Sequence, residues 1–83
     1  MKKLGVVLHT TSYGNLLVRG NLSSKKVVSR IAGSVVVTKN MKKIGKVYDV
    51  FGPAKQPYLS IKPFEHISES ELYELSNDLV YIL

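Results

Sequence analysis

Cysteine is absent from this chain of 83 residues. Neither a disulfide framework nor a thiolate metal site can therefore stabilise it, and stability must come from packing or from partners. A chain this short supports only one hydrophobic core. We therefore predict one domain that spans residues 1–83.

Long apolar runs are also missing. The opening apolar stretch, residues 4–8, ends at His9 and is shorter than the roughly 7 residues that a signal peptide needs. No later run approaches the about 18 consecutive apolar residues of a transmembrane helix. We expect a soluble, cytoplasmic protein with no membrane partner.

Acidic residues do not occur in the first 48 positions. This part holds ten of the twelve Lys and Arg residues, whereas residues 49–83 hold all six Asp and Glu residues. Such a field attracts polyanions and speeds association with them. The alternative is a solvated surface that keeps a small domain soluble. The candidate contacts to RNA or another anionic surface are Lys25, Lys26, Arg30, Lys39, Lys42 and Lys43.

Short β-type runs make up most of the chain. Residues 4–8 and 15–19, separated by a Thr/Ser/Gly-rich segment, predict a hairpin. The mixed polarity of both faces of residues 41–51 indicates either a bulge or a strand covered on both sides. The remaining predicted strands are residues 35–38, 59–62 and 79–83, and residues 27–28 stay unassigned.

One helix start is visible at Ser68. Its hydroxyl can cap the N–H of Glu71, whose carboxylate can reach back, while Ile67 and Leu72 form the accompanying hydrophobic staple. The apolar pattern predicts only one to two turns. Short strands with one short helix indicate a closed or nearly closed β-barrel, because closure removes exposed edges.

Residues 44–63, IGKVYDVFGPAKQPYLSIKP, resemble the signature of the GAR family, subunits of the box H/ACA ribonucleoprotein. The shared positions are Gly45, Val47, Asp49, Val50, Phe51, Gly52, Pro53, Pro57, Tyr58, Ile61, Lys62 and Pro63. The first 21 residues are similar to archaeal members through Leu4, Gly5, Val7, Leu8, His9, Gly14, Leu16, Val18, Arg19 and Asn21. Residues 22–43 and 64–78 share only general character with the family.

The resemblance implies an all-β fold, a six-stranded β-barrel of the translation-factor and reductase type, in an archaeal-like form without Gly/Arg-rich tails. It implies a subunit that is not an enzyme and has no cofactor. Such a subunit binds the catalytic domain of a dyskerin-like pseudouridine synthase within a guide-RNA complex that modifies rRNA. Contact with a mobile loop of the synthase would tune substrate loading and product release. The guide RNA and the other small subunits are then partners through the complex, without direct contact to the guide RNA.

A stiff aromatic segment is the candidate partner-binding site. Gly52, Pro53 and Pro57 fix a turn that can present Phe51 and Tyr58 at little ordering cost. Taken alone, these residues favour a rigid barrel corner, since Gly and Pro mark turns more often than interfaces; the resemblance favours the interface. The predicted set is Phe51, Gly52, Pro53, Pro57, Tyr58, Ile61, Lys62 and Pro63.

Catalytic and metal sites are not indicated. His9 and His66 have no second ligand at a recognisable spacing. Asp49 has no neighbouring base or second carboxylate, and we expect it to accept a hydrogen bond from the Gly52 region instead.

Two alternatives to the synthase-bound subunit stay open: a freestanding RNA-binding barrel that uses the basic half, and a translation-factor-like barrel. Sequence readout of RNA would need exposed aromatics, and the basic half has only Tyr13 and Tyr48.

Overall fold

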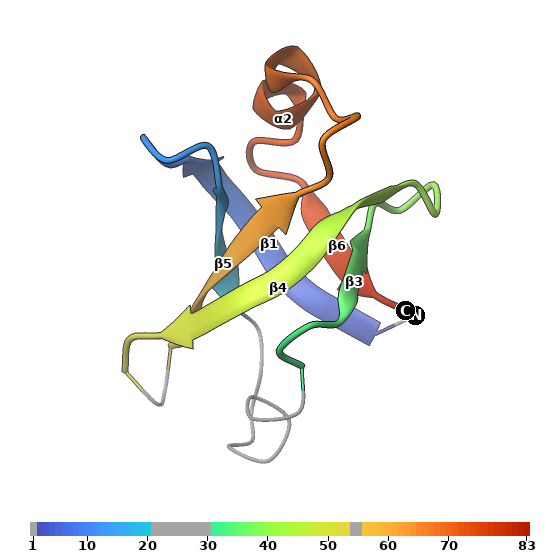
Figure 1. The fold of residues 1–83 in the computed structure, drawn as a ribbon. Coiled ribbons are helices and arrows are strands. Elements are labelled where there is room, and N and C mark those ends of the chain that lie inside the picture. The colour runs from blue at the N-terminus through green and yellow to red at the C-terminus, as the bar shows by residue number, and fades with distance from the viewer. Residues whose placement is uncertain (1, 21–30, 54–55) are drawn as a thin grey trace.

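The computed structural model describes residues 2–20, 31–53 and 56–83, which form a β-barrel (Figure 1). Its elements are β1 (Lys2–Thr10), β2 (Leu16–Gly20), β3 (Val35–Val37), β4 (Lys43–Phe51), β5 (Tyr58–Pro63), α2 (Glu69–Glu74) and β6 (Leu79–Ile82). The strands close in the order β1-β2-β5-β4-β3-β6, and every neighbouring pair is antiparallel. The predicted six-stranded barrel with one short helix is confirmed over the described residues.

The β1–β2 hairpin forms as predicted. The N–H of Thr11 donates to the carbonyl of Asn15 at 2.7 Å, and Gly14 has a φ of +84°, a conformation that glycine adopts at little cost. β1 is longer than the predicted residues 4–8 because both of its ends pair with a neighbour. Lys2 lies opposite Ile82 of β6, and Thr10 lies opposite Leu16 of β2.

β4 contains a bulge, one of the two predicted explanations for its mixed polarity. Its register with β5 shifts between Val47 and Asp49, which leaves Tyr48 outside the ladder. A bulge changes which residues face inward. After it, Val50 lies opposite the buried Leu59, so the strand continues to cover the core.

Closure depends on the shortest strand. β3 pairs with β6 through Val36–Ile82 and Val37–Tyr81 and with β4 on its other side. The N–H of Leu83 adds a bond to the carbonyl of Val35 at 3.2 Å. Among the described residues, the six strands therefore form one closed ring of pairings, which removes the two open edges of a flat sheet.

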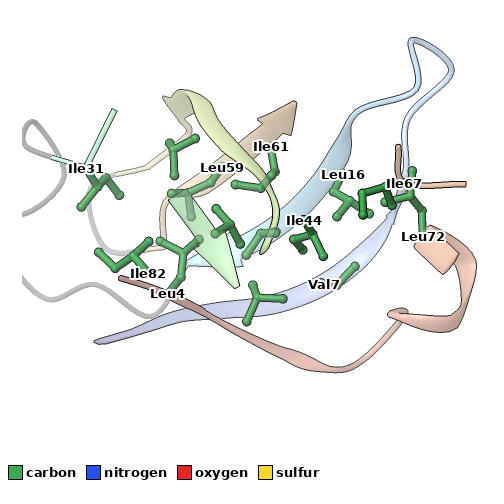
Figure 2. Packing of buried hydrophobic residues seen from close by; sticks show 14 residues of the cluster. Leu4, Val7, Leu16, Ile31, Ile44, Leu59, Ile61, Ile67, Leu72 and Ile82 are labelled. Carbon is green, nitrogen blue, oxygen red and sulfur yellow. The ribbon is translucent and has the colours of Figure 1, made fainter. Parts of the chain in front are cut away.

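The core fills the barrel along its length (Figure 2). Figure 2 shows Ile67 and Leu72 beside Leu16 at one end of the cluster, with Leu4 and Ile82 toward the other. The predicted cap is present, because Ser68 Oγ accepts from the N–H of Glu71 at 3.3 Å. Ile67 and Leu72 are both buried, so the helix closes one end of the barrel.

Different segments of the chain lie at the two ends of the barrel. At one end, called here the helix end, lie α2, the turn after β1, residues 38–42 and residues 64–68. At the other, called the termini end, lie both chain termini and the connection from β4 to β5 (Figure 1). No helix among the described residues has the length and apolar character needed to cross a membrane.

Candidate functional site

Two aromatic rings lie together on the outside of the barrel at the termini end. Phe51 ends β4 and lies opposite Tyr58, the first residue of β5. Their ring centroids are 6.1 Å apart and the rings are inclined by 27°, a stacked arrangement. Phe51 is 45% exposed and Tyr58 is partly buried. The pair therefore combines a fixed geometry with an apolar face that water can reach.

The connection after Phe51 is anchored to the end of β2. The N–H of Gly20 donates to the carbonyl of Pro57 at 2.8 Å, and the Gln56 side-chain amide donates to the carbonyl of Gly20, also at 2.8 Å. Gly52 has a φ of +94°, and its backbone lies directly against the Tyr58 ring. These contacts hold the aromatic pair in one position.

The pair continues an outer row that crosses five strands. Arg19 lies opposite Tyr58, Val6 opposite Arg19, and Leu79 opposite Val6. Residues directly opposite one another in antiparallel strands point to the same face. The row, which we call the outer row, consists of Leu79, Val6, Arg19, Tyr58 and Phe51. The predicted partner-binding set did not include its first three members, because their place beside Tyr58 depends on how the strands pair.

Two residues of the predicted interface are core residues. Ile61 is fully buried in the barrel interior, and Pro57 is buried against Gly20. The structure therefore does not bring either side chain to the surface beside Phe51, and their part in partner binding stays a prediction.

The other predicted interface residues are divided between the two ends. Gly52 and Pro53 are exposed beside Phe51. Lys62 is exposed opposite Lys46, and Pro63 is partly buried opposite Gly45. Since β5 runs toward the helix end, these last two lie away from the aromatic pair. The compact candidate site is therefore the aromatic pair with Gly52 and Pro53, extended along the outer row.

Asp49 has a role other than the predicted bond to the Gly52 region. Its Oδ1 accepts a hydrogen bond from the N–H of Val50 at 2.9 Å, directly after the bulge. A bulge disrupts the ladder locally and leaves backbone groups without strand partners. The carboxylate therefore supports the bulge that turns Tyr48 out to solvent, where it is exposed.

The basic candidates that the structure describes lie at the helix end. Lys39, Lys42 and Lys43 are all exposed, in or beside the turn between β3 and β4. Lys42 forms an ion pair with Glu71 of α2. Lys25, Lys26 and Arg30 lie outside the described residues. The described basic candidates are therefore separated from Phe51 by the length of β4, roughly 25 Å at about 3.3 Å per residue.

The Lys42–Glu71 pair links the β3–β4 turn to the helix. The hydrogen bond from Lys42 holds the pKa of Glu71 below its ordinary value of 4.5, against a smaller opposing effect of desolvation. Ser68 Oγ also donates to the Glu71 carboxylate at 3.3 Å. The carboxylate therefore serves the helix cap and the ion pair together.

Metal-ligating side chains do not gather in the part of the chain that the structure describes: no group of three His, Cys, Asp or Glu residues there is placed to hold an ion. His9 lies in β1 opposite Leu17, while the His66 ring stacks on Phe64. The arrangement around the outer row offers apolar contact and one guanidinium, which suits recognition of a macromolecule.

The chain is similar to a described protein family and to two archaeal proteins. The family described as the Gar1/Naf1 RNA binding region matches residues 1–83, the whole chain. An uncharacterised protein of Methanothermobacter thermautotrophicus is 33% identical over 82 residues, which is 99% of this chain and 83% of that protein. An uncharacterised protein of Methanocaldococcus jannaschii is 44% identical over 73 residues, or 87% of this chain and 82% of that protein.

Proposed function

The chain belongs to the Gar1/Naf1 RNA-binding region family, whose role is associated with the H/ACA ribonucleoprotein, and we propose that it is a non-catalytic subunit of that particle. In this proposal it docks on the catalytic domain of a dyskerin-like pseudouridine synthase. The observation that carries the proposal is the exposed, stacked Phe51–Tyr58 pair on an anchored turn.

The composition of the outer row suits a protein partner. Aromatic residues and arginine are enriched among residues that dominate binding energy, and here Arg19 lies next to Tyr58 in the row. Because hydrogen bonds with Gly20 already fix Gln56 and Pro57 just before Tyr58, little conformational entropy is lost when a partner covers this ring. The row is also continuous with Val6 and Leu79, which extend the apolar area across the barrel.

The proposal gives this chain an indirect part in the reaction. Asp49, the one acid among the first 64 residues, has its carboxylate engaged by the backbone of Val50. The chain would instead act by holding a mobile loop of the synthase, and so tune substrate loading and product release.

A freestanding RNA-binding barrel is the second candidate, favoured by the ten cationic residues in the first 48 positions. The two candidates differ in their response to salt. Binding through phosphates weakens steeply as salt is raised, because counterions are released. Binding through an apolar protein surface changes much less.

The experiment is a pull-down of the tagged chain from an archaeal extract after RNase treatment, with bound proteins identified by mass spectrometry. We expect a pseudouridine synthase to remain bound at high salt. The pull-down is repeated with Phe51→Ala, which should lose the synthase. Tyr13→Ala is its matched control, because Tyr13 is 90% exposed but lies in the turn at the opposite end. Loss of the synthase on RNase treatment, with RNA bound by the isolated chain, would favour the second candidate.

A further inference from the structure

The helix end carries a shallow hollow that the proposed protein interface does not use. It lies between the start of β4 and the segment that follows β5. The residues that line it are Met41, Lys42, Lys43, Phe64, Glu65 and His66. Lysines beside an aromatic pair are the combination found in surfaces that bind single-stranded nucleic acid.

The aromatic floor of the hollow is preformed. The rings of Phe64 and His66 are nearly parallel, inclined by 13°, with centroids 5.8 Å apart. The N–H of Phe64 donates to the carbonyl of Ile44 at 2.9 Å, and the N–H of Ile67 donates to the carbonyl of Phe64 at 3.0 Å. Phe64 packs against the core while His66 is exposed. The imidazole is therefore a flat platform on a fixed support.

Met41 also lines the hollow, at a conformational cost. It has a φ of +67°, a conformation that glycine adopts with less strain than a residue with a side chain. Its side chain is 52% exposed, so burial does not compensate. Strained residues of this kind cluster at binding sites. A flexible, polarisable thioether at the rim suits contact with an aromatic ligand.

The charges of the hollow favour a single anionic group. Lys42 is engaged by Glu71, whereas Lys43 makes no ion pair within the described parts of the chain. Glu65 lines the same hollow and weakens the positive potential. One available ammonium beside a stacking platform fits one phosphate and its adjoining base better than an acidic peptide, which would need several cations and no flat surface.

We propose that this hollow binds an unpaired RNA segment, with a base stacked on His66 and a neighbouring phosphate at Lys43. The family description names RNA binding but assigns it to no residues, and this hollow gives it a place on the barrel. Stacking and a phosphate contact read no base edges, so binding would tolerate different sequences. The length of β4 separates the hollow from Phe51, which leaves it accessible while a protein covers the aromatic pair. This inference rests on the proposed function in one respect: the H/ACA particle would supply the RNA that the hollow binds.

The test is fluorescence anisotropy of a labelled ten-nucleotide oligoadenylate titrated with the full chain. We expect His66→Ala to weaken binding about 5-fold or more, and His66→Tyr to bind at least as well as the wild type because it keeps a stacking surface. His9→Ala, the matched histidine control on β1, should bind normally. Equal affinities for wild type and His66→Ala, or no binding by the wild type, would overturn the proposal.

Charge variants test the phosphate contact separately. Lys43→Ala should reduce the slope of log affinity against log salt by about 0.7, while Lys3→Ala at the termini end should leave it unchanged. Glu65→Gln should strengthen binding. Inorganic polyphosphate should compete poorly with the RNA, since it lacks bases. Equal effects of Lys43→Ala and Lys3→Ala, or equal competition by polyphosphate, would show diffuse attraction and refute the site.

Phe51→Ala distinguishes this inference from the proposed function. It should bind the oligoadenylate as the wild type does and still lose the synthase. If the wild type binds the synthase but not the oligoadenylate, only the RNA site in the hollow is refuted. If the synthase does not bind but His66→Ala weakens RNA binding, only the proposed docking is refuted.

Discussion

Replacing Gly52 with Ala perturbs the candidate interface without removing either aromatic ring. Gly52 has a φ of +94°, outside the conformations that residues with a Cβ adopt readily. A Cβ at this position would also lie 2.8 Å from Cδ2 of Tyr58, closer than van der Waals contact allows. The substitution therefore strains the backbone and pushes the Tyr58 ring away from Phe51.

The expected magnitude follows from these two effects. A left-handed conformation costs an L-residue about 1–2 kcal/mol, and the reduced freedom of the unfolded chain returns about 0.5–1 kcal/mol. Loss of the Phe51–Tyr58 stack adds about 0.5–1.5 kcal/mol. We therefore expect Gly52→Ala to lower the free energy of unfolding by about 2 kcal/mol.

Gly14→Ala is the control, because Gly14 has a similar φ of +84° but no atom within 4 Å of an added Cβ. It should lose about 1 kcal/mol from the backbone alone. Urea denaturation measures both variants, and calorimetry measures their affinity for the synthase, which only Gly52→Ala should reduce. Equal stability and equal affinity of the two variants would refute the reasoning.

Three further changes test the fold. Ser68→Ala should lower the free energy of unfolding by about 1 kcal/mol in urea denaturation, because it removes the helix cap; an unchanged value would contradict the cap. Gly45→Ala should cost about 3 kcal/mol or more by the same measurement, since its Cβ would overlap the Lys62 carbonyl and force β4 from β5; a normal midpoint would contradict this packing. The pKa of Glu71 is lowered in the folded state by Lys42, so the contribution of the Glu71 carboxylate to stability is present above pH 4.5 and is lost as pH falls through the lowered pKa. In thermal melts, the melting temperature of Glu71→Gln should therefore fall less in acid than that of the wild type. An equal fall would count against the ion pair.

Local signals in the sequence predicted the elements that depend on neighbouring residues. The Ser68 cap and its staple lie within one turn of helix, and the β1–β2 hairpin needs only a short turn between two apolar runs. The bulge in β4 was also detectable, because its polarity disagreed with simple alternation. These features require no knowledge of which distant segments meet.

Distant pairings were not predictable in the same way. Arg19 lies opposite Tyr58 only because β2 pairs with β5, although β3 and β4 come between these strands in the sequence. No pattern in the sequence fixes that register. Ile61 was assigned to the interface because it belongs to the family signature, although its alternation with Ser60 and Lys62 already indicated an inward position. A signature contains both core and surface residues, and only burial separates them.

The stack of His66 on Phe64 had no sequence signal either. Phe64 and His66 lie outside any strand or helix, so neither the two-residue period of a strand nor the period of a helix relates their rings. Here a turn, closed by the bond from Ile67 to the Phe64 carbonyl, folds one ring over the other. The sequence alone therefore does not place the His66 ring on Phe64.

The most direct test of the central claim is titration calorimetry of the pseudouridine synthase with wild type, Phe51→Ala and Tyr13→Ala, alongside circular dichroism melts. We predict that Phe51→Ala stays folded and loses only the about 0.5–1.5 kcal/mol of its stack with Tyr58, since Phe51 is 45% exposed. Its affinity should fall by about 2 kcal/mol, roughly 30-fold, while Tyr13→Ala binds normally. A folded Phe51→Ala variant with wild-type affinity would contradict the claim that the aromatic pair docks on the synthase.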